Sequence, residues 1–237
     1  MPGDRTVLNT SVYEFPAIPG FVSEPQPFLL RQAEELPDIP AMPETLLAME
    51  LQLQERSVDL SEISALILDD IGATLQILRL ASGEYGQEDR PARIEDCISA
   101  LGLRACLRAA SNAAPMKGSG HRALAQFRAH SCEIAHLCRL LAEEMPELAA
   151  PQEAYLTGLL HDMGALPAVL GWNRSDLPAN RTLAAMRMAE QWSLPTFLKD
   201  FFRHVSLPES RLSKLVSMAH RLAEGSPASC SLTGSVV

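Results

Sequence analysis

The chain has 237 residues, of which 47% are hydrophobic and 21% are charged. This length can bury a sizeable core, and the composition is near the globular average, which excludes a disordered or fibrous chain. No apolar run approaches the ~20 residues that cross a bilayer, and the N-terminus lacks an apolar signal core. Five cysteines without a CxxC pair fit reduced side chains in apolar stretches. We therefore expect a soluble, cytoplasmic protein.

Charge is distributed unevenly along the chain. The net charge of −9 argues against a protein that binds nucleic acid by neutralising phosphates. Residues 34–70 hold ten acidic residues and one basic residue, whereas residues 90–128 hold seven basic and two acidic residues. Two explanations remain open: the stretches are solvated helix faces that partly neutralise one another, or the basic stretch binds an anionic partner.

Four segments can be distinguished. Residues 1–35 carry five prolines and predict an irregular N-terminal arm, while the small, polar residues 225–237 predict a flexible tail. Between them apolar residues repeat at helical spacing, and no stretch alternates with a period of two for long enough to suggest a strand. The break PMKGSG separates an N-terminal lobe (36–115) from a C-terminal lobe (121–224). We predict an all-α protein with two helical lobes.

Caps and glycines set the expected helix boundaries. Asp59 and Glu62 form a capping-box pattern. Gly72 is expected to separate two helices, and Gly83 is expected to end the second of them. Helices are predicted around residues 43–53, 59–67, 75–80, 94–101 and 103–114 in the first lobe. In the second lobe a long helix with an apolar stripe that includes Phe127 and Leu141 is predicted to stop near Pro146. Further helices are predicted from about 152 to 162 and over 180–192, 195–204 and 208–224.

The most specific local motif is GLLHDMG at residues 158–164. Its adjacent His161 and Asp162 end a predicted helix, where an unwinding backbone lets an imidazole and a carboxylate converge on a cation. His130 lies on the preceding long helix, which could pack antiparallel and bring it close. The alternative is that these side chains only form hydrogen bonds within the fold.

Longer stretches resemble the HDOD domain, the non-catalytic relative of the HD-type metal-dependent phosphohydrolases. The first lobe contributes LPDIPAMPETLLAM, VDLSEISALILDDIGATLQILRLASGEYG and RIEDCISALGLRACLRAA. The second lobe contributes FRAHSCEIAHLCRLLAEEM and EAYLTGLLHDMGAL, followed by a weaker match in EQWSLPTFLKDFFRHV. The resemblance spans about residues 36–224. It implies that the second lobe is a degenerate HD-type helical bundle.

The resemblance also implies a vestigial metal site. Catalytic relatives use an upstream histidine, the HD pair and a distant aspartate as ligands. Here His130, His161 and Asp162 match the first three, and His220 stands in the aspartate's place. With one secure carboxylate to bridge cations, we expect no catalysis and no bound cofactor, with a charged histidine paired to Asp162. A single divalent metal held by these four residues is the alternative.

For function, the resemblance implies a non-enzymatic, protein-binding regulatory module in bacterial signal transduction. Such domains occur beside receiver, kinase or cyclic-di-GMP-turnover domains. None is visible in this chain, so we expect the partner to be a separate signalling protein such as a kinase, a response regulator or a cyclic-di-GMP-turnover protein. The alternative is a metal-dependent phosphohydrolase acting on nucleotides or cyclic dinucleotides.

Arginines near the junction of the lobes are candidates for binding that partner. The guanidinium group pairs bidentately with carboxylates while its stem packs, and arginine is common in binding hot spots. The candidate residues are Arg90, Arg93, Arg104 and Arg108. The alternative is that they pair internally with the acidic stretch at 34–70.

Overall fold

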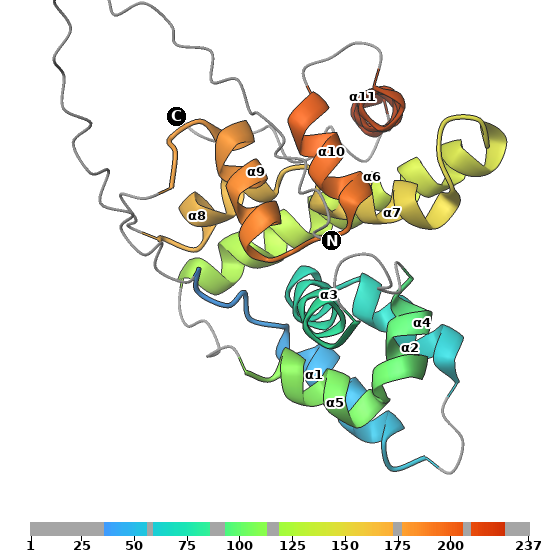
Figure 1. Ribbon diagram of the computed structural model, residues 1–237, viewed down its shortest axis with the longest axis vertical. Coiled ribbons are helices and arrows are strands. Elements are labelled where there is room, and N and C mark those ends of the chain that lie inside the picture. Colours follow the sequence, from blue (N-terminus) through green and yellow to red (C-terminus); the bar gives the residue numbers. More distant parts are fainter. Residues whose placement is uncertain are drawn as a thin grey trace, which may run out of the picture. The chain divides into compact units, whose positions relative to one another are not determined.

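A computed structural model describes residues 36–55, 59–85, 93–112, 119–172, 177–205 and 210–225. All regular secondary structure in these ranges is helical, so the all-α prediction is confirmed (Figure 1). The predicted arm at 1–35 lies outside the described residues, as do residues 226–237 of the predicted tail and most of the predicted break. No helix in the described ranges is both long and apolar enough to cross a membrane.

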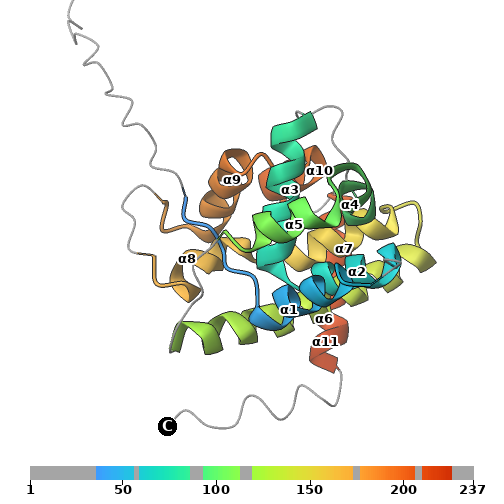
Figure 2. The ribbon, with the colours of Figure 1, turned by 90° about the horizontal axis from the view of Figure 1, so that it is seen from below.

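The first five helices pack against one another. They are α1 (Pro43–Gln52), α2 (Leu60–Leu68), α3 (Ile71–Tyr85), α4 (Ile94–Leu101) and α5 (Leu103–Ala110). Helix α3 contacts α2, α4 and α5, and α1 contacts α2 and α5 (Figures 1 and 2). Because α3 is in the middle of this group, nine of its fifteen residues are buried.

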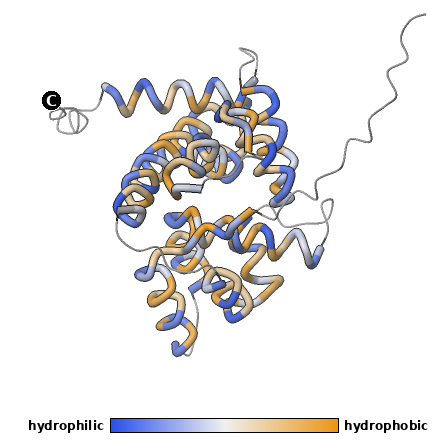
Figure 3. Tube along the Cα trace, turned by 90° about the vertical axis from the view of Figure 1, so that its left-hand side faces the viewer, coloured by the Kyte–Doolittle hydropathy of each residue, from blue (hydrophilic) through white to orange (hydrophobic). Residues whose placement is uncertain are grey.

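The remaining helices form a second group around one long helix. They are α6 (Ser119–Glu144), α7 (Pro151–Leu160), the 3₁₀ turn η1 (Met163–Ala165), α8 (Leu166–Val169), α9 (Arg181–Gln191), α10 (Thr196–His204) and α11 (Arg211–Gly225). Helix α6 contacts α7, α8 and α11, whereas α9 contacts η1 and α10. Hydrophobic and hydrophilic residues alternate along the helices (Figure 3), as expected where one face of each helix is buried.

The junction between α2 and α3 differs from the sequence prediction. Asp69 and Asp70, and not Gly72, separate the two helices, and Asp70 bonds to the backbone on both sides. Its carboxylate accepts the Met42 N–H at 2.6 Å and the Ala73 N–H at 3.2 Å, which caps the start of α3. Gly72 lies inside α3, where a Cβ would be 2.2 Å from the Pro40 carbonyl oxygen. The glycine therefore allows the segment before α1 to pass closely over α3.

At the other helix ends, some of the caps and stops predicted from the sequence are confirmed and others are not. Asp59 caps α2 as predicted, since its carboxylate accepts the Ser61 N–H at 2.9 Å. Gly83 does not end α3, which continues to Tyr85; one glycine inside a helix costs only about 1 kcal/mol. Helix α5 ends at Ala110, before the predicted residue 114.

The end of α2 connects the two groups of helices. The Asp69 carbonyl oxygen accepts a hydrogen bond from the Arg128 guanidinium of α6 and lies 3.4 Å from the Cys132 thiol. The Asp69 carboxylate accepts the Tyr155 hydroxyl of α7 at 3.1 Å. The same carboxylate lies 3.6 Å from Nε2 of the His136 imidazole. Four side chains from α6 and α7 therefore meet at one residue of the first group.

Candidate functional site

Close packing of α6 and α7 creates the candidate site. At Gly158 of α7 a Cβ would lie 2.6 Å from the Ala135 Cα of α6, so only glycine permits the two helices to approach this closely. This contact brings His161, the residue that follows α7, beside His130 of α6. Helix α11 packs against both helices and contributes His220.

The three imidazole rings lie close together. The His130 ring centroid lies 5.3 Å from that of His161 and 5.3 Å from that of His220, and the last two centroids are 4.8 Å apart. One nitrogen from each ring lies within 4.8 Å of the other two, and all three residues are half-buried. The structure therefore brings together three of the four residues named for the vestigial site.

Hydrogen bonding fixes the tautomer of His161. Its Nδ1 lies 2.7 Å from the Gly158 carbonyl oxygen. A carbonyl can only accept, so Nδ1 carries the hydrogen and Nε2 presents a lone pair. That Nε2 atom lies 3.1 Å from Nε2 of His220. The backbone at the end of α7 thus aims the His161 lone pair at the centre of the cluster.

Two histidines of the cluster favour the neutral form. Burial is the largest cause that lowers the pKa of His161 to about 4; the neighbouring His220 and His130 act in the same direction, while the hydrogen bond with the Gly158 carbonyl opposes the shift. Burial, followed by repulsion from His130, also lowers the pKa of His220, while Glu224 and Asp162 oppose this shift. A neutral His161 differs from the charged histidine that the sequence suggested for a metal-free site. Desolvation of the ring explains the difference.

Asp162 is not part of the three-histidine cluster. A Cβ at Gly164 would be 2.0 Å from the Arg181 carbonyl oxygen, so the turn after the HD pair packs against the start of α9. This contact places the Asp162 carboxylate 4.0 Å from the Arg181 guanidinium, with about a third of the side chain exposed. The imidazole and carboxylate of the HD pair therefore do not converge on one point, as the sequence had suggested.

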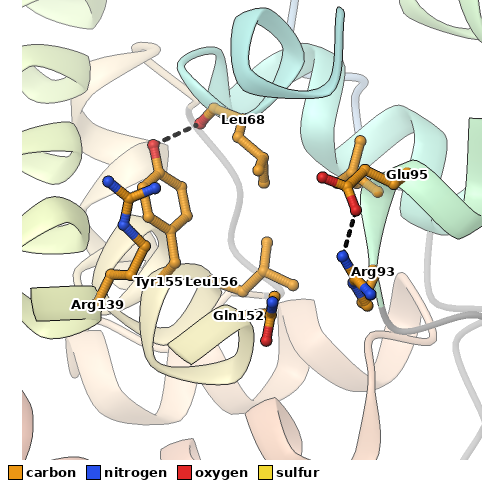
Figure 4. Close-up of a pocket in the computed structure, with 8 residues that line it drawn as sticks. Leu68, Arg93, Glu95, Arg139, Gln152, Tyr155 and Leu156 are labelled. Atoms are coloured by element: carbon orange, nitrogen blue, oxygen red, sulfur yellow. Dashed lines mark hydrogen bonds and ion pairs between the residues drawn. The ribbon is translucent and has the colours of Figure 1, made fainter. Parts of the chain in front are cut away.

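A pocket of about 130 Å³ lies where the two groups of helices meet (Figure 4). Two arginines line it, and both have partners: Arg93 pairs with Glu95, and the Arg139 guanidinium lies 5.9 Å from the centre of the Tyr155 ring. Burial and the Asp69 carboxylate raise the pKa of Tyr155. Sequence patterns did not reveal this pocket, because its lining comes from helices that are distant in the chain.

The four candidate arginines differ in their surroundings. Arg90 lies outside the described residues, and Arg93 pairs with Glu95 on the rim of the pocket. Arg104 and Arg108 are exposed on α5, and neither forms an ion pair within the described part of the chain. The proposed pairing with the acidic stretch is therefore not found for these two residues among the described ranges.

Three of the four cysteines in the described ranges are unsuited to nucleophilic chemistry. Cys97, Cys106, Cys132 and Cys138 form no disulfide. Burial raises the pKa of Cys106 and Cys132 to about 11 and that of Cys138 to about 12. Thiols with such pKa values stay protonated at neutral pH, so they are poor nucleophiles and poor metal ligands.

The chain is all-helical, and histidines from α6, from α11 and from the end of α7 meet beside an HD dipeptide. The sequence matches the model of the HDOD domain over residues 39–173. This stretch is more than half of the chain, which belongs to the HDOD domain family. The resemblance noted in the sequence is thereby confirmed.

Individual relatives agree with this family and fold. An uncharacterized protein of Treponema pallidum (strain Nichols) is 25% identical over 205 residues, which cover 75% of this chain and 40% of that protein. The chain thus spans less than half the length of this curated relative.

A structure of the MmoQ response regulator (fragment 20–298) of Methylococcus capsulatus str. Bath is similar with a TM-score of 0.63. It is 22% identical and covers 85% of this chain and 94% of that one. A second MmoQ structure gives a TM-score of 0.59 at 22% identity, covering 80% and 89% of the two chains. This similarity establishes the fold.

Proposed function

We propose that this protein is a non-enzymatic regulatory module of bacterial signal transduction that acts in the cytoplasm by binding another protein. Membership of the HDOD family and a fold shared with a protein described as a response regulator fit a signalling role. The partner is a signalling protein such as a kinase, a response regulator or a protein of cyclic-di-GMP turnover. A net charge of −9 disfavours nucleic acid as the ligand.

The composition of the three-histidine cluster carries the non-enzymatic part of this proposal. A dinuclear phosphohydrolase needs carboxylates that bridge two cations and lower the pKa of the bound water. Among the described residues, the group that could hold a metal contains His130, His161 and His220 and no carboxylate. Asp162, the one carboxylate of the HD pair, lies beside Arg181 instead.

Hydrolysis assays test this proposal. The purified chain is incubated with bis(p-nitrophenyl) phosphate, nucleoside triphosphates and cyclic dinucleotides, each with Mg²⁺, Mn²⁺, Fe²⁺ or Zn²⁺. We expect no turnover above that of His161→Ala. Turnover that disappears in His161→Ala and persists in His204→Ala, where an exposed histidine is changed, would overturn the proposal.

The alternative function is a metal-dependent phosphohydrolase acting on nucleotides or cyclic dinucleotides. The observation in its favour is the convergence of three imidazoles on one point, since a single metal held by three histidines can activate water. The same assays separate the two functions, because only the alternative requires turnover that depends on His161.

A further inference from the structure

We propose that His130, His161 and His220 bind one divalent transition-metal cation of borderline softness, for which Zn²⁺ is the probe. The ligands are one imidazole nitrogen from each of these three histidines, and Asp162 is not among them. The proposal goes beyond the regulatory function, because a bound cation requires no turnover and no partner.

Distances between the ring nitrogens fit such a cation. Zinc binds histidine nitrogen at about 2.0–2.1 Å in a tetrahedral arrangement, which places neighbouring ligand nitrogens roughly 3.3 Å apart. The Nε2 atoms of His161 and His220 are 3.1 Å apart. The three ligand nitrogens all lie within 4.8 Å of one another, so small ring rotations bring them to bonding distance.

The surroundings of the rings orient their lone pairs for a metal. The Gly158 carbonyl holds the hydrogen of His161 on Nδ1, at 2.7 Å, which is the usual way in which a backbone group fixes a metal-binding histidine. A proton shared between His161 and His220 would satisfy that pair without a cation. It would leave out the third ring, His130, whose nitrogens have no hydrogen-bond partner among the described residues.

The ligand type predicts which ions bind. Imidazoles suit zinc, iron, copper, nickel and cobalt, whereas magnesium and calcium prefer carboxylates and water. Three protein ligands leave one position of a tetrahedral ion open to water. The cluster is the one group with ligand spacing found among the described residues, so the stoichiometry is one ion per chain.

Metal binding is measured on the full chain after any histidine tag has been removed. The protein is stripped with a chelator, loaded with Zn²⁺ and desalted, and its zinc content is determined by elemental analysis. We expect one zinc per chain. In separate melting curves recorded with zinc in large excess over Kd, the melting temperature should be at least about 5 °C above that of the stripped protein. Mg²⁺ should leave the melting temperature unchanged.

Matched variants locate the ion. We expect His130→Ala and His220→Ala each to weaken zinc binding at least about tenfold, while His204→Ala binds zinc as the wild type does. His220→Gln keeps the volume of the side chain and replaces His220→Ala if that variant does not fold. Melting curves of the stripped variants show that each one is folded.

Two results would overturn the inference: no zinc retained by the wild type, or zinc retained equally by the His130 and His220 variants. Neither result affects the non-enzymatic proposal, which depends on the hydrolysis assays. Conversely, zinc binding together with turnover that depends on His161 would support this inference and overturn the non-enzymatic proposal.

Discussion

Gly158 and Gly164 flank the HD pair in the sequence. At each of them another part of the backbone lies too close to leave room for a side chain. Part of the HD motif is therefore required for packing, whatever its histidine binds. Gly158 permits the contact between α7 and α6 that brings His161 to His130. Gly164 permits the contact with α9 that gives Asp162 an arginine neighbour.

Gly158→Ala should destabilise the protein by about 1–3 kcal/mol, because its Cβ would lie 2.6 Å from the Ala135 Cα and the two helices must separate. Gly83→Ala is the matched control. It lies in α3, exposed, with nothing within 4 Å of the added Cβ, and should stabilise the protein by about 0.5–1 kcal/mol. Denaturant unfolding measures both changes. Equal stability of the two variants would contradict the close contact of α6 and α7.

Two aspartates that precede a turn or helix should differ in their contribution to stability. Asp70 is buried and accepts two backbone N–H groups, so Asp70→Ala should cost about 1–3 kcal/mol through unpaired donors. Asp162 is partly exposed, and its arginine neighbour is largely exposed. Asp162→Ala should therefore cost less than about 1 kcal/mol. A larger loss for Asp162→Ala, measured by thermal unfolding, would instead support the pairing of Asp162 with a charged histidine that the sequence had suggested.

Among the helices, periodicity and caps predicted the positions of the long elements well, because each signal lies within its own helix. Asp59 caps α2 as expected. The ends of α3 and α5 were misplaced by a few residues, and two further errors occur where a distant segment decides the outcome. Gly72 is enclosed in α3 because Pro40 passes over it, and the HD carboxylate faces α9 because Gly164 fits against Arg181. Neither approach can be deduced from a local pattern.

Helix α5 exposes the arginines that we expect to contact the partner. Arg104→Glu combined with Arg108→Glu should leave helicity unchanged, because neither side chain pairs within the described ranges. It should weaken partner binding about tenfold or more, measured by titration calorimetry with the purified partner. The control is Arg122→Glu with Arg211→Glu, an equal charge change at two exposed arginines of α6 and α11. A loss of helicity, or equal weakening by the control pair, would contradict this interface.

At the scale of the whole described chain, Asp69 connects the two groups of helices. Arg128 and Tyr155, which contact Asp69, are 59 and 86 positions away from it in the sequence. Counting charges along the chain could therefore not identify these contacts. The buried residues of both groups also form one hydrophobic cluster, which includes Ile67 and Leu160. Shared burial and a shared polar contact predict that the described helices unfold together.

Arg128 and Tyr155 both donate hydrogen bonds to Asp69, one to its carbonyl and the other to its carboxylate. Tyr155→Phe alone should cost about 0.5–1.5 kcal/mol. Arg128→Ala removes a charged donor and should cost more, about 1.5–3 kcal/mol. Because both act on the position of one residue, the double variant should differ from the sum of the single variants by about 0.5 kcal/mol or more.

A control cycle pairs Tyr155→Phe with Arg203→Ala, which removes an ion pair between α10 and Glu190 of α9. These two changes share no partner, so their free energies of unfolding should add. Denaturant unfolding of all variants gives both coupling energies. If the cycle through Asp69 is as additive as the control, the two donors act independently. The packed hydrophobic cluster would then hold the two groups of helices together without help from Asp69.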